Sequence, residues 1–138
     1  MKKIVRECVC IIIPKNNAVL VEKRKKDKRL DPGILAIPGG GIEKNESFEQ
    51  ATKREAKEEL GITVQKTEFL TKLIYDTPHG RFPCQYVIAK KWKGKIHSFE
   101  AEKVFWLPIK QVYRLGIYVD RQAMQIFMEN QKRFVGYT

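Results

Sequence analysis

The sequence has few cysteines, no long apolar run and no low-complexity segment, and each of these absences excludes a class of protein. Its three cysteines are an odd number without zinc-ligand spacing, which excludes a disulfide framework and a structural zinc site. No apolar run approaches the roughly 20 residues that a membrane-spanning helix needs. Residues 1–14 have a basic start and a short apolar stretch, but Arg6 and Glu7 interrupt it and no small-residue cleavage site follows. We therefore expect a strand there, a cytoplasmic protein and no membrane partner.

The remaining composition is that of one globular domain. The chain has 138 residues, of which 43% are hydrophobic and 10% aromatic, enough for a single hydrophobic core. No segment has the composition of a disordered region. We therefore predict one domain over residues 1–138. Cys8 and Cys10 alternate along an expected strand, so both side chains should lie on one face of it as buried thiols.

Charge is unevenly distributed along the chain. The formal net charge is +11 at pH 7, from 27 Lys and Arg against 16 Asp and Glu. This charge suits polyanionic partners such as nucleotides and nucleic acid, although lysine-rich surfaces also serve solubility. Residues 40–62 differ, with six acids and four bases and thus a net charge of −2, which leaves ten acids and 23 bases elsewhere. Crowded carboxylates on a helix repel one another, so a bound cation is the expected compensation.

The apolar periodicity predicts a chain of mixed strands and helices. Ser47 as N-cap and Gln50 three residues later form a capping box, and Gly61 is the expected C-terminal stop, so a helix should span 47–60. A four-residue turn at 14–17 should join two strands into a hairpin. The expected segments are strands at 4–13, 18–24, 34–37, 62–75, 84–92 and 103–107, a loop at 76–83, and a second helix at 120–131.

Three glutamates of the first predicted helix have metal-ligand spacing. Glu55, Glu58 and Glu59 stand at i, i+3 and i+4, so their carboxylates meet on one face. Such hard oxygen ligands suit Mg²⁺ or Mn²⁺ rather than zinc. The glycines at 39–41 can expose backbone groups to an ion and let a phosphate approach closely. Together these parts suit displacement at phosphorus, although a glutamate cluster alone is more often a solvated face.

The same residues carry a family resemblance. Gly40, Glu46 and the run REAKEELGI at 54–62 resemble the Nudix box, GX5EX7REUXEEXGU, in which U is a bulky aliphatic residue. All seven fixed residues are met over the 23 positions, and the one departure is Ala56 at an aliphatic position. The segments AVLVEKR, PGG, QYVIAKKWKG and EAEKVFWL also resemble that superfamily. The chain is thus similar to MutT-like Nudix hydrolases over most of its length.

The resemblance implies a fold, a cofactor and roles for individual residues. The implied fold is of the α/β (α+β) kind, a mixed β-sheet sandwiched between α-helices, and the implied cofactor is Mg²⁺ or Mn²⁺. Glu55 is the position most often proposed as general base, and Arg54 would orient the carboxylates. The implied metal ligands are Glu55, Glu58, Glu59, the Gly39 carbonyl and either Glu100 or Glu102. Gly40 would lie near the phosphates and Gly61 would be structural, while Glu46 would brace the loop–helix turn or take a weaker metal role.

Other residues are candidates for substrate contacts, each with a plainer alternative. Arg24 stands where relatives often carry a phosphate-contacting arginine, but it is equally an exposed strand-end charge. Asp120 resembles the position that reads a purine edge, but it also suits a helix N-cap. His79 is either a phosphate contact or an exposed loop residue. The lysines at 23, 25, 26 and 28 are either phosphate contacts or a solvated loop, and Tyr75, Phe82, Tyr86 and Trp106 either stack on a base or fill the core.

The resemblance implies hydrolysis of a nucleoside diphosphate linked to another group. A MutT-like nucleoside triphosphate pyrophosphohydrolase is the leading interpretation, with an oxidised purine such as 8-oxo-dGTP as the familiar substrate and a monophosphate and pyrophosphate as products. Alternatives are an ADP-ribose or other nucleotide-sugar pyrophosphatase, which Pro78 favours weakly by its position, and removal of pyrophosphate from 5′-triphosphate RNA. A non-catalytic nucleotide- or RNA-binding module is less consistent with a complete box. A homodimer is compatible with the resemblance.

Overall fold

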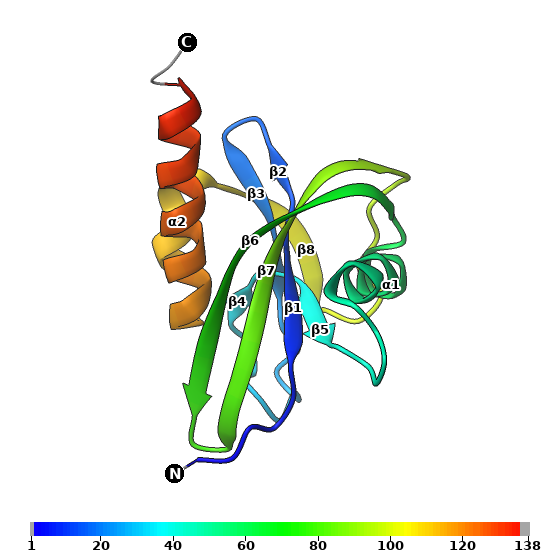
Figure 1. The fold of residues 1–138 in the computed structure, drawn as a ribbon, viewed down its shortest axis with the longest axis vertical. Coiled ribbons are helices and arrows are strands. Elements are labelled where there is room, and N and C mark those ends of the chain that lie inside the picture. Colours follow the sequence, from blue (N-terminus) through cyan, green and yellow to red (C-terminus); the bar gives the residue numbers. More distant parts are fainter. Residues whose placement is uncertain (1, 136–138) are drawn as a thin grey trace.

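The strands form two sheets that share one sandwich with helices on its outer faces (Figure 1). The computed structural model describes the backbone of residues 2–135 and the side chains of residues 2–131. The elements are β1 (Cys8–Ile12), β2 (Pro14–Lys15), β3 (Ala18–Lys23), β4 (Leu35–Ala36), β5 (Gly39–Gly41), α1 (Phe48–Leu60), β6 (Thr63–Thr77), β7 (Gly80–Lys93), β8 (Lys103–Pro108), a 3-10 helix (Ile109–Arg114) and α2 (Tyr118–Val135).

The first sheet is mixed and the second is antiparallel. In the order β5-β1-β7-β6, β1 runs parallel to β7 while the other two pairings are antiparallel. In the second sheet β3 pairs antiparallel with β2, β4 and β8. The predicted fold class, a mixed sheet arrangement between helices, is therefore confirmed.

Strands that are apolar on both faces explain why helices cover both sides. Ile12 and Val21 belong to a core cluster completed by α2 residues, including Met124 and Phe127. Ile11, Ile13 and Leu20 belong to a second cluster, with Ala56 and Leu60 of α1. Since successive side chains of a strand point to opposite faces, a run such as CVCIII must be covered on each side. Figure 1 shows α1 and α2 on the two sides of the strands.

The predicted hairpin of 4–13 with 18–24 is wrong in its pairing. The strand begins at Cys8, and β1 pairs with β5 and β7 rather than with β3. Only the short β2 pairs with β3, through a turn in which Asn16 has a φ of 56°. The chain crosses from one sheet to the other between β1 and β2. The cause is tertiary: the neighbours of β1 come from distant segments, which local turn residues cannot reveal.

The predicted loop at 76–83 is also wrong. β6 and β7 form one long hairpin whose pairing extends from Thr63 with Lys93 to Thr77 with Gly80. The connection shrinks to Pro78 and His79, where the Thr77 hydroxyl donates to the Gly80 carbonyl at 2.8 Å and accepts from the His79 N–H at 3.1 Å. Gly80 has a φ of 131°, which glycine adopts readily. The tight turn replaces the loop that the proline and glycine suggested.

The first helix agrees with its prediction, while the second is longer than expected. The Ser47 hydroxyl accepts the Gln50 N–H at 3.1 Å and the Gln50 side chain accepts the Ser47 N–H at 2.9 Å, so the capping box is confirmed. Gly61 ends α1 in the left-handed conformation with a φ of 74°. α2 begins at Tyr118, two residues before the predicted start. In residues 2–135, neither helix has the length and apolar content that crossing a membrane requires.

Candidate active site

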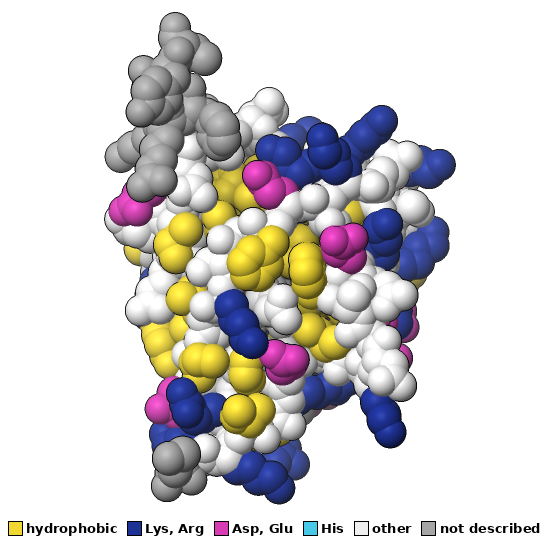
Figure 2. Space-filling view, viewed as in Figure 1, with side chains coloured by type: hydrophobic (Ala, Val, Ile, Leu, Met, Phe, Trp, Pro, Cys, Tyr) yellow, Lys and Arg dark blue, Asp and Glu magenta, His cyan; other side chains and the backbone are white. Residues whose placement is uncertain are grey.

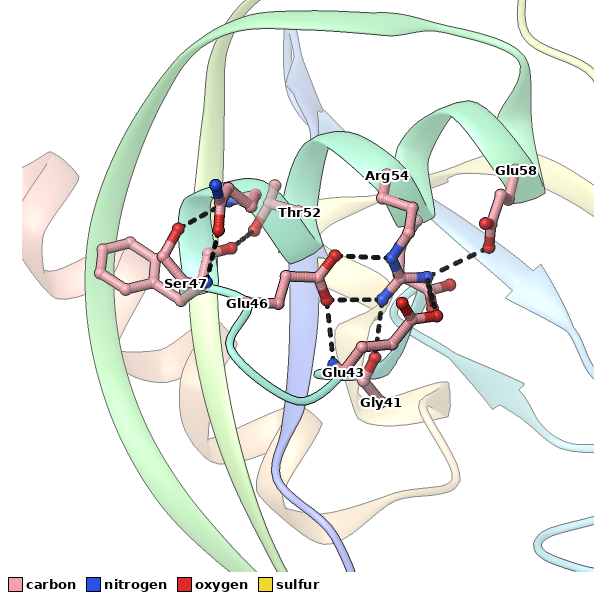
Figure 3. A network of polar contacts seen from close by, with 10 residues as sticks. Gly41, Glu43, Glu46, Ser47, Thr52, Arg54 and Glu58 are labelled. Carbon is pink, nitrogen blue, oxygen red and sulfur yellow. Dashed lines mark hydrogen bonds and ion pairs between the residues drawn. The ribbon is translucent and has the colours of Figure 1, made fainter.

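Arg54 is the centre of a polar network between α1 and the loop before it (Figure 3). Its Nε and Nη2 donate to the two carboxylate oxygens of Glu46 at 2.7 and 2.8 Å, a bidentate arrangement. Nη2 also donates to the Gly41 carbonyl at 2.9 Å. Nη1 donates to Glu55 at 2.9 Å and to Glu58 at 3.2 Å. One guanidinium therefore holds three carboxylates and a loop carbonyl in fixed relative positions.

Glu46 ties the loop to the helix. Besides Arg54, its carboxylate accepts the Glu43 N–H at 3.0 Å. The Arg54 side chain, with help from that backbone donor, holds the pKa of Glu46 down at about 2. Arg54 in turn has a raised pKa because of its carboxylate partners, Glu46 first. Glu46 thus braces the loop against the helix through Arg54 and the Glu43 N–H.

Gly40 is a glycine because the Glu55 carboxylate lies against it. A Cβ at Gly40 would lie 2.4 Å from Glu55 Oε1. Pairing of β5 with β1 holds Gly40 in place opposite Val9. The neighbouring Gly39 is also closely packed, since a Cβ there would clash with the Val9 carbonyl oxygen. Glu55 is only 8% exposed. Burial raises its pKa, the Arg54 partner lowers it, and the charges of Glu58 and Glu100 raise it further.

Among the box acids, Glu59 has a buried carboxyl oxygen, Oε2, without any hydrogen-bond donor to compensate it. Burial raises the pKa of Glu59 to about 10, and the charges of Glu22, Glu55 and Glu100 add to the effect. Glu58 differs, because its side chain is 53% exposed and turned toward Arg54. The box acids therefore do not share one environment, although they share one helix.

These features fit a divalent cation. A buried carboxylate oxygen without a donor is costly unless a cation approaches it. Carboxylate and carbonyl oxygens are also the ligands that Mg²⁺ and Mn²⁺ prefer. Among the described residues, no three His, Cys, Asp or Glu side chains are arranged to hold an ion as they stand. The donor set is thus gathered at one place, but its side chains are not in ligand geometry.

The two late glutamates have different surroundings. Glu100 lines a small pocket together with Glu22 and Glu59. Glu102 instead lies 3.5 Å from Lys23 Nζ, and its backbone N–H donates to the Lys23 carbonyl at 3.0 Å. Of the two alternatives that the sequence left open, the geometry therefore favours Glu100 as the residue near the box acids.

Sequence reasoning missed Glu22, which lies on β3 and is only 7% exposed. Burial raises its pKa to about 7, Arg24 lowers it, and Asp120 and Glu100 raise it. The sequence held only part of the signal. Glu22 follows Leu20 by two residues, so on a strand it shares the face of this apolar residue. That α1 covers this face is decided by the tertiary structure, in which Leu20 packs with Ala56 and Leu60.

A pocket of about 180 Å³ adjoins the acids. It lies between the two sheets, with the N-terminal turn of α2 at one side. Gly39, Gly40 and Glu22 line it on the side of the box. Its other lining residues include Cys8, Cys10, Cys84, Ile37, Leu30, Asp31, Tyr75, Phe82, Tyr86 and Asp120. Of the cysteines, Cys84 is buried and the other two are half-buried.

Asp120 lies in this pocket and is not an N-cap. It is in the first turn of α2, 2% exposed, and its side chain points away from the helix backbone to two other partners. Oδ2 accepts the Ile37 N–H at 3.0 Å and Oδ1 accepts the Tyr86 hydroxyl at 2.6 Å. Burial raises the pKa of Asp120 to about 6, against the lowering effect of those two donors. The N-cap alternative is therefore wrong.

The remaining candidates separate into those near the pocket and those away from it. Tyr75, Phe82 and Tyr86 line the pocket, whereas Trp106 packs on the α1 side of the sheet, with Lys15 Nζ 5.4 Å from its ring centroid. Trp106 therefore lies outside this pocket, and its stacking role stays an untested prediction. His79 is exposed in the β6–β7 turn and lines another pocket, with Pro78.

Arg24 is largely engaged with its own loop. Its Nε donates to the carbonyls of Leu30 and Asp31 at 3.2 and 3.1 Å, and Nη2 donates to Leu30 at 3.0 Å. Nη1 is 3.7 Å from Glu22. Lys25 and Lys28, by contrast, are exposed and line the small pocket beside Glu22, Glu59 and Glu100. Arg24 thus shapes a loop that brings two lysines to the acids.

Comparison with known proteins places this site in a family. The family model described as "NUDIX domain" matches residues 4–127. The 8-oxo-dGTP diphosphatase of Escherichia coli K12 is 33% identical over 109 residues, which cover 79% of this chain and 83% of that protein. The nucleoside triphosphatase NudI of Enterobacter sp. strain 638 is 44% identical over 62 residues, 45% of this chain and 44% of that protein.

Solved structures agree with the family on the fold. The MutT NUDIX hydrolase from Burkholderia pseudomallei superposes with a TM-score of 0.80 at 22% identity, covering 87% of this chain and 95% of that chain. The chain therefore belongs to the NUDIX family. Its predicted resemblance to MutT-like members of the family is confirmed as well.

Proposed function

We propose that this Nudix protein is a nucleoside triphosphate pyrophosphohydrolase, with an oxidised purine triphosphate such as 8-oxo-dGTP as its leading substrate. One observation carries the proposal: a single pocket is lined at one side by buried Asp120 and at the other by Gly39 and Gly40, against which Glu55 packs. A base bound near Asp120 would have its phosphates at the box acids. The names of the E. coli and Enterobacter relatives support the same substrate class.

Mg²⁺ or Mn²⁺ would be held by the carboxylates of Glu55, Glu58, Glu59 and Glu100 and by the Gly39 carbonyl. When bound, the cation would neutralise charge on the phosphates and favour ionisation of the attacking water. Glu55, whose pKa burial raises, is the candidate to accept the proton of that water. A new oxygen–phosphorus bond forms as the bond to the leaving oxygen breaks, giving the nucleoside monophosphate and pyrophosphate. Arg54 keeps Glu55 and Glu58 in position by its hydrogen bonds.

Asp120 is the candidate for base selection. Its carboxyl group is buried, so a hydrogen bond to a purine edge would be made without competition from water. With a pKa raised to about 6, it is a proton donor in mildly acidic solution and an acceptor above it. Tyr86 and Ile37 hold its two oxygens and orient the group.

A specific observation favours ADP-ribose or another nucleotide sugar as the second candidate. A neighbouring pocket of about 410 Å³, which includes Tyr118, Pro78 and His79, shares Leu30, Asp31 and Tyr75 with the first pocket. A substrate with a second sugar would fill both. On the face in Figure 2 the Lys and Arg side chains stand at several separate places, so this face carries no continuous basic stripe for RNA.

The test is product identification from a nucleotide panel with Mg²⁺ or Mn²⁺. The panel contains ordinary and 8-oxo nucleoside triphosphates, ADP-ribose, dinucleoside polyphosphates and 5′-triphosphate RNA. We expect monophosphate and pyrophosphate, formed fastest from an oxidised purine triphosphate. AMP and ribose 5-phosphate as main products would establish the second candidate instead. Absence of turnover throughout would overturn the proposal and favour a binding module.

A further inference from the structure

Glu22 is a buried acid for which the Nudix box provides no role. It lies on β3, opposite Ala36 of β4 and Val104 of β8. A solvent-facing glutamate on an interior strand needs no explanation, but Glu22 is only 7% exposed. Removing a carboxylate from water is costly unless it meets a positive charge or hydrogen-bond donors. The surroundings of Glu22 therefore have to contain the compensation.

The protein supplies little of that compensation. Arg24 is the cation nearest to Glu22, with Nη1 at 3.7 Å, which is beyond hydrogen-bonding distance. The hydrogen bonds that Arg24 donates, from Nε and Nη2, go to the carbonyls of Leu30 and Asp31. Lys25 and Lys28 line the same pocket, but both are exposed to solvent. One partly engaged arginine and two solvated lysines therefore face Glu22, Glu59 and Glu100.

Further acids face Glu22 from other elements. Glu59 from α1 and Glu100 from the segment after β7 line the small pocket with it. Asp120 of α2 also acts on Glu22 by its charge. Glu59 presents the buried Oε2 that has no hydrogen-bond partner. That orphaned oxygen is a second observation, independent of the crowding, that favours a cation between these side chains.

We propose that Glu22 is a metal ligand from outside the box, which together with Glu59 and Glu100 holds a divalent cation on the β3 side of α1. The inference rests on the proposed function, since it extends the metal site of that hydrolase. Arg54 occupies Glu55 and Glu58, whereas Glu22, Glu59 and Glu100 have no comparable arginine. Together with Glu59 and Glu100, Glu22 would supply the carboxylate oxygens that a divalent cation such as Mg²⁺ or Mn²⁺ needs as ligands.

The position of Glu22 gives the ion a relation to substrate. Glu22 lines both the small pocket of the acids and the larger pocket that contains Asp120. An ion held there lies between the proposed base site and Lys25 and Lys28. Phosphates that extend from the larger pocket would reach the ion and the lysines together.

The direct test is Mn²⁺ binding to the full chain without nucleotide, measured by titration calorimetry and by the electron paramagnetic resonance signal of free Mn²⁺. For Glu22→Gln we expect about a tenfold or greater loss of affinity, or loss of one bound ion. Glu68→Gln is the matched control, because Glu68 is an exposed acid whose partner is Lys90, at 3.4 Å. Wild-type Mn²⁺ affinity in Glu22→Gln would overturn the inference.

The outcomes separate this inference from the proposed function. If the wild-type chain hydrolyses triphosphates and Glu22→Gln binds Mn²⁺ normally, the function stands and the inference fails. If the wild-type chain hydrolyses nothing but loses Mn²⁺ affinity on Glu22→Gln, the ligand assignment stands and the function fails. If the wild-type chain binds no Mn²⁺ without nucleotide, the inference fails, and the nucleotide panel alone decides the proposed function. Should Glu22→Gln not fold, Glu22→Asp retains the charge on a shorter side chain and must also weaken Mn²⁺ binding.

Discussion

Two groups of acids in this molecule meet the same problem, crowded negative charge, in different ways. Glu46, Glu55 and Glu58 all accept hydrogen bonds from Arg54, so the protein itself provides their counterion. Glu22, Glu59 and Glu100 share a pocket in which one carboxylate oxygen is orphaned. The first group is fixed in place before any ligand arrives. The second group is the one that an added cation can stabilise.

The pKa values express the same contrast. Arg54 lowers the pKa of Glu46 to about 2, while burial and neighbouring acids raise that of Glu59 to about 10. An opposite charge nearby stabilises the ionised form of a carboxyl group and lowers its pKa, whereas burial without such a partner destabilises the ionised form and raises the pKa. Substitutions that remove one charge from each group should therefore have opposite effects on stability.

Glu59→Gln should have the largest effect on activity. Loss of a metal-facing carboxylate removes several kcal/mol of transition-state stabilisation, which corresponds to about a hundredfold or greater loss of kcat. The melting temperature without metal should not fall, because the folded chain must protonate this buried carboxyl near pH 7, a cost that glutamine does not carry. Steady-state kinetics and thermal unfolding measure the two effects. Glu49→Gln, an exposed acid in the first turn of the same helix, serves as control. A wild-type rate in Glu59→Gln would remove Glu59 from the metal site.

Gly40→Ala should affect activity much more than stability. The added Cβ would lie 2.4 Å from the Glu55 carboxylate, which is the free end of a side chain and can move aside. A displacement of about 1 Å costs on the order of a hundredfold in rate. Single-turnover kinetics and urea unfolding separate the two effects. In a Glu55→Gln background the same substitution should add little, and an undiminished additional loss would show that Gly40 acts elsewhere.

Arg54→Gln should destabilise the fold, in contrast to Glu59→Gln. It leaves three carboxylates and the Gly41 carbonyl without their donor, with an expected loss of about 2–3 kcal/mol in the free energy of unfolding. Urea denaturation without metal measures this loss. Arg54→Lys should recover only part of it, since an ammonium cannot donate to Glu46 in the bidentate manner. Equal stability of Arg54→Gln and the wild type would contradict the division into two groups.

The predicted effect of Asp120 on stability is seen as a dependence on pH. Its pKa is about 6 in the folded chain against an ordinary value of 3.8, so the folded state binds the proton more tightly. Stability from this group is complete below about pH 4 and is lost as the pH rises through about 6, by about 2–3 kcal/mol. Urea denaturation from pH 4 to 8 should show this fall in the wild type and a smaller fall in Asp120→Asn. If the free energy of unfolding fell equally with pH in the wild type and in Asp120→Asn, the pKa of Asp120 would not be raised in the folded chain.

The same residue offers a functional measurement. If Asp120 reads the base, Asp120→Ala should reduce the ratio of kcat/KM for 8-oxo-dGTP over dGTP by about tenfold, the effect of a buried hydrogen bond to substrate. An unchanged ratio with lowered stability would leave Asp120 only its structural bonds to Ile37 and Tyr86.

Local patterns predicted the box helix well. The capping box, the glycine stop and the spacing of Glu55, Glu58 and Glu59 depend on residues within one turn or two of each other. Helix geometry makes such spacing readable from the chain alone. Arg54 was also expected to orient carboxylates, and its hydrogen bonds to Glu55 and Glu58 are consistent with that role.

Pairing between distant segments accounts for the failures. The partners of β1 come from residues 39–41 and 84–88, so neighbouring turn residues suggested the wrong hairpin. The burial of Glu22 depends on α1 covering β3, and the hydrogen bonds of Asp120 depend on Ile37 and Tyr86. Asp120 therefore resembled an N-cap in sequence although its oxygens face a pocket.

By itself, the sequence determined the chemistry of the box, the boundaries of α1 and the family, because all three depend on residue identities at short, regular spacing. Only the tertiary structure decided which acids share a counterion, which of Glu100 and Glu102 lies near Glu59, and that Glu22 belongs beside them. The physical reason is that burial and electrostatic interaction depend on distance in space, and strand pairing brings together residues that the chain separates by dozens of positions.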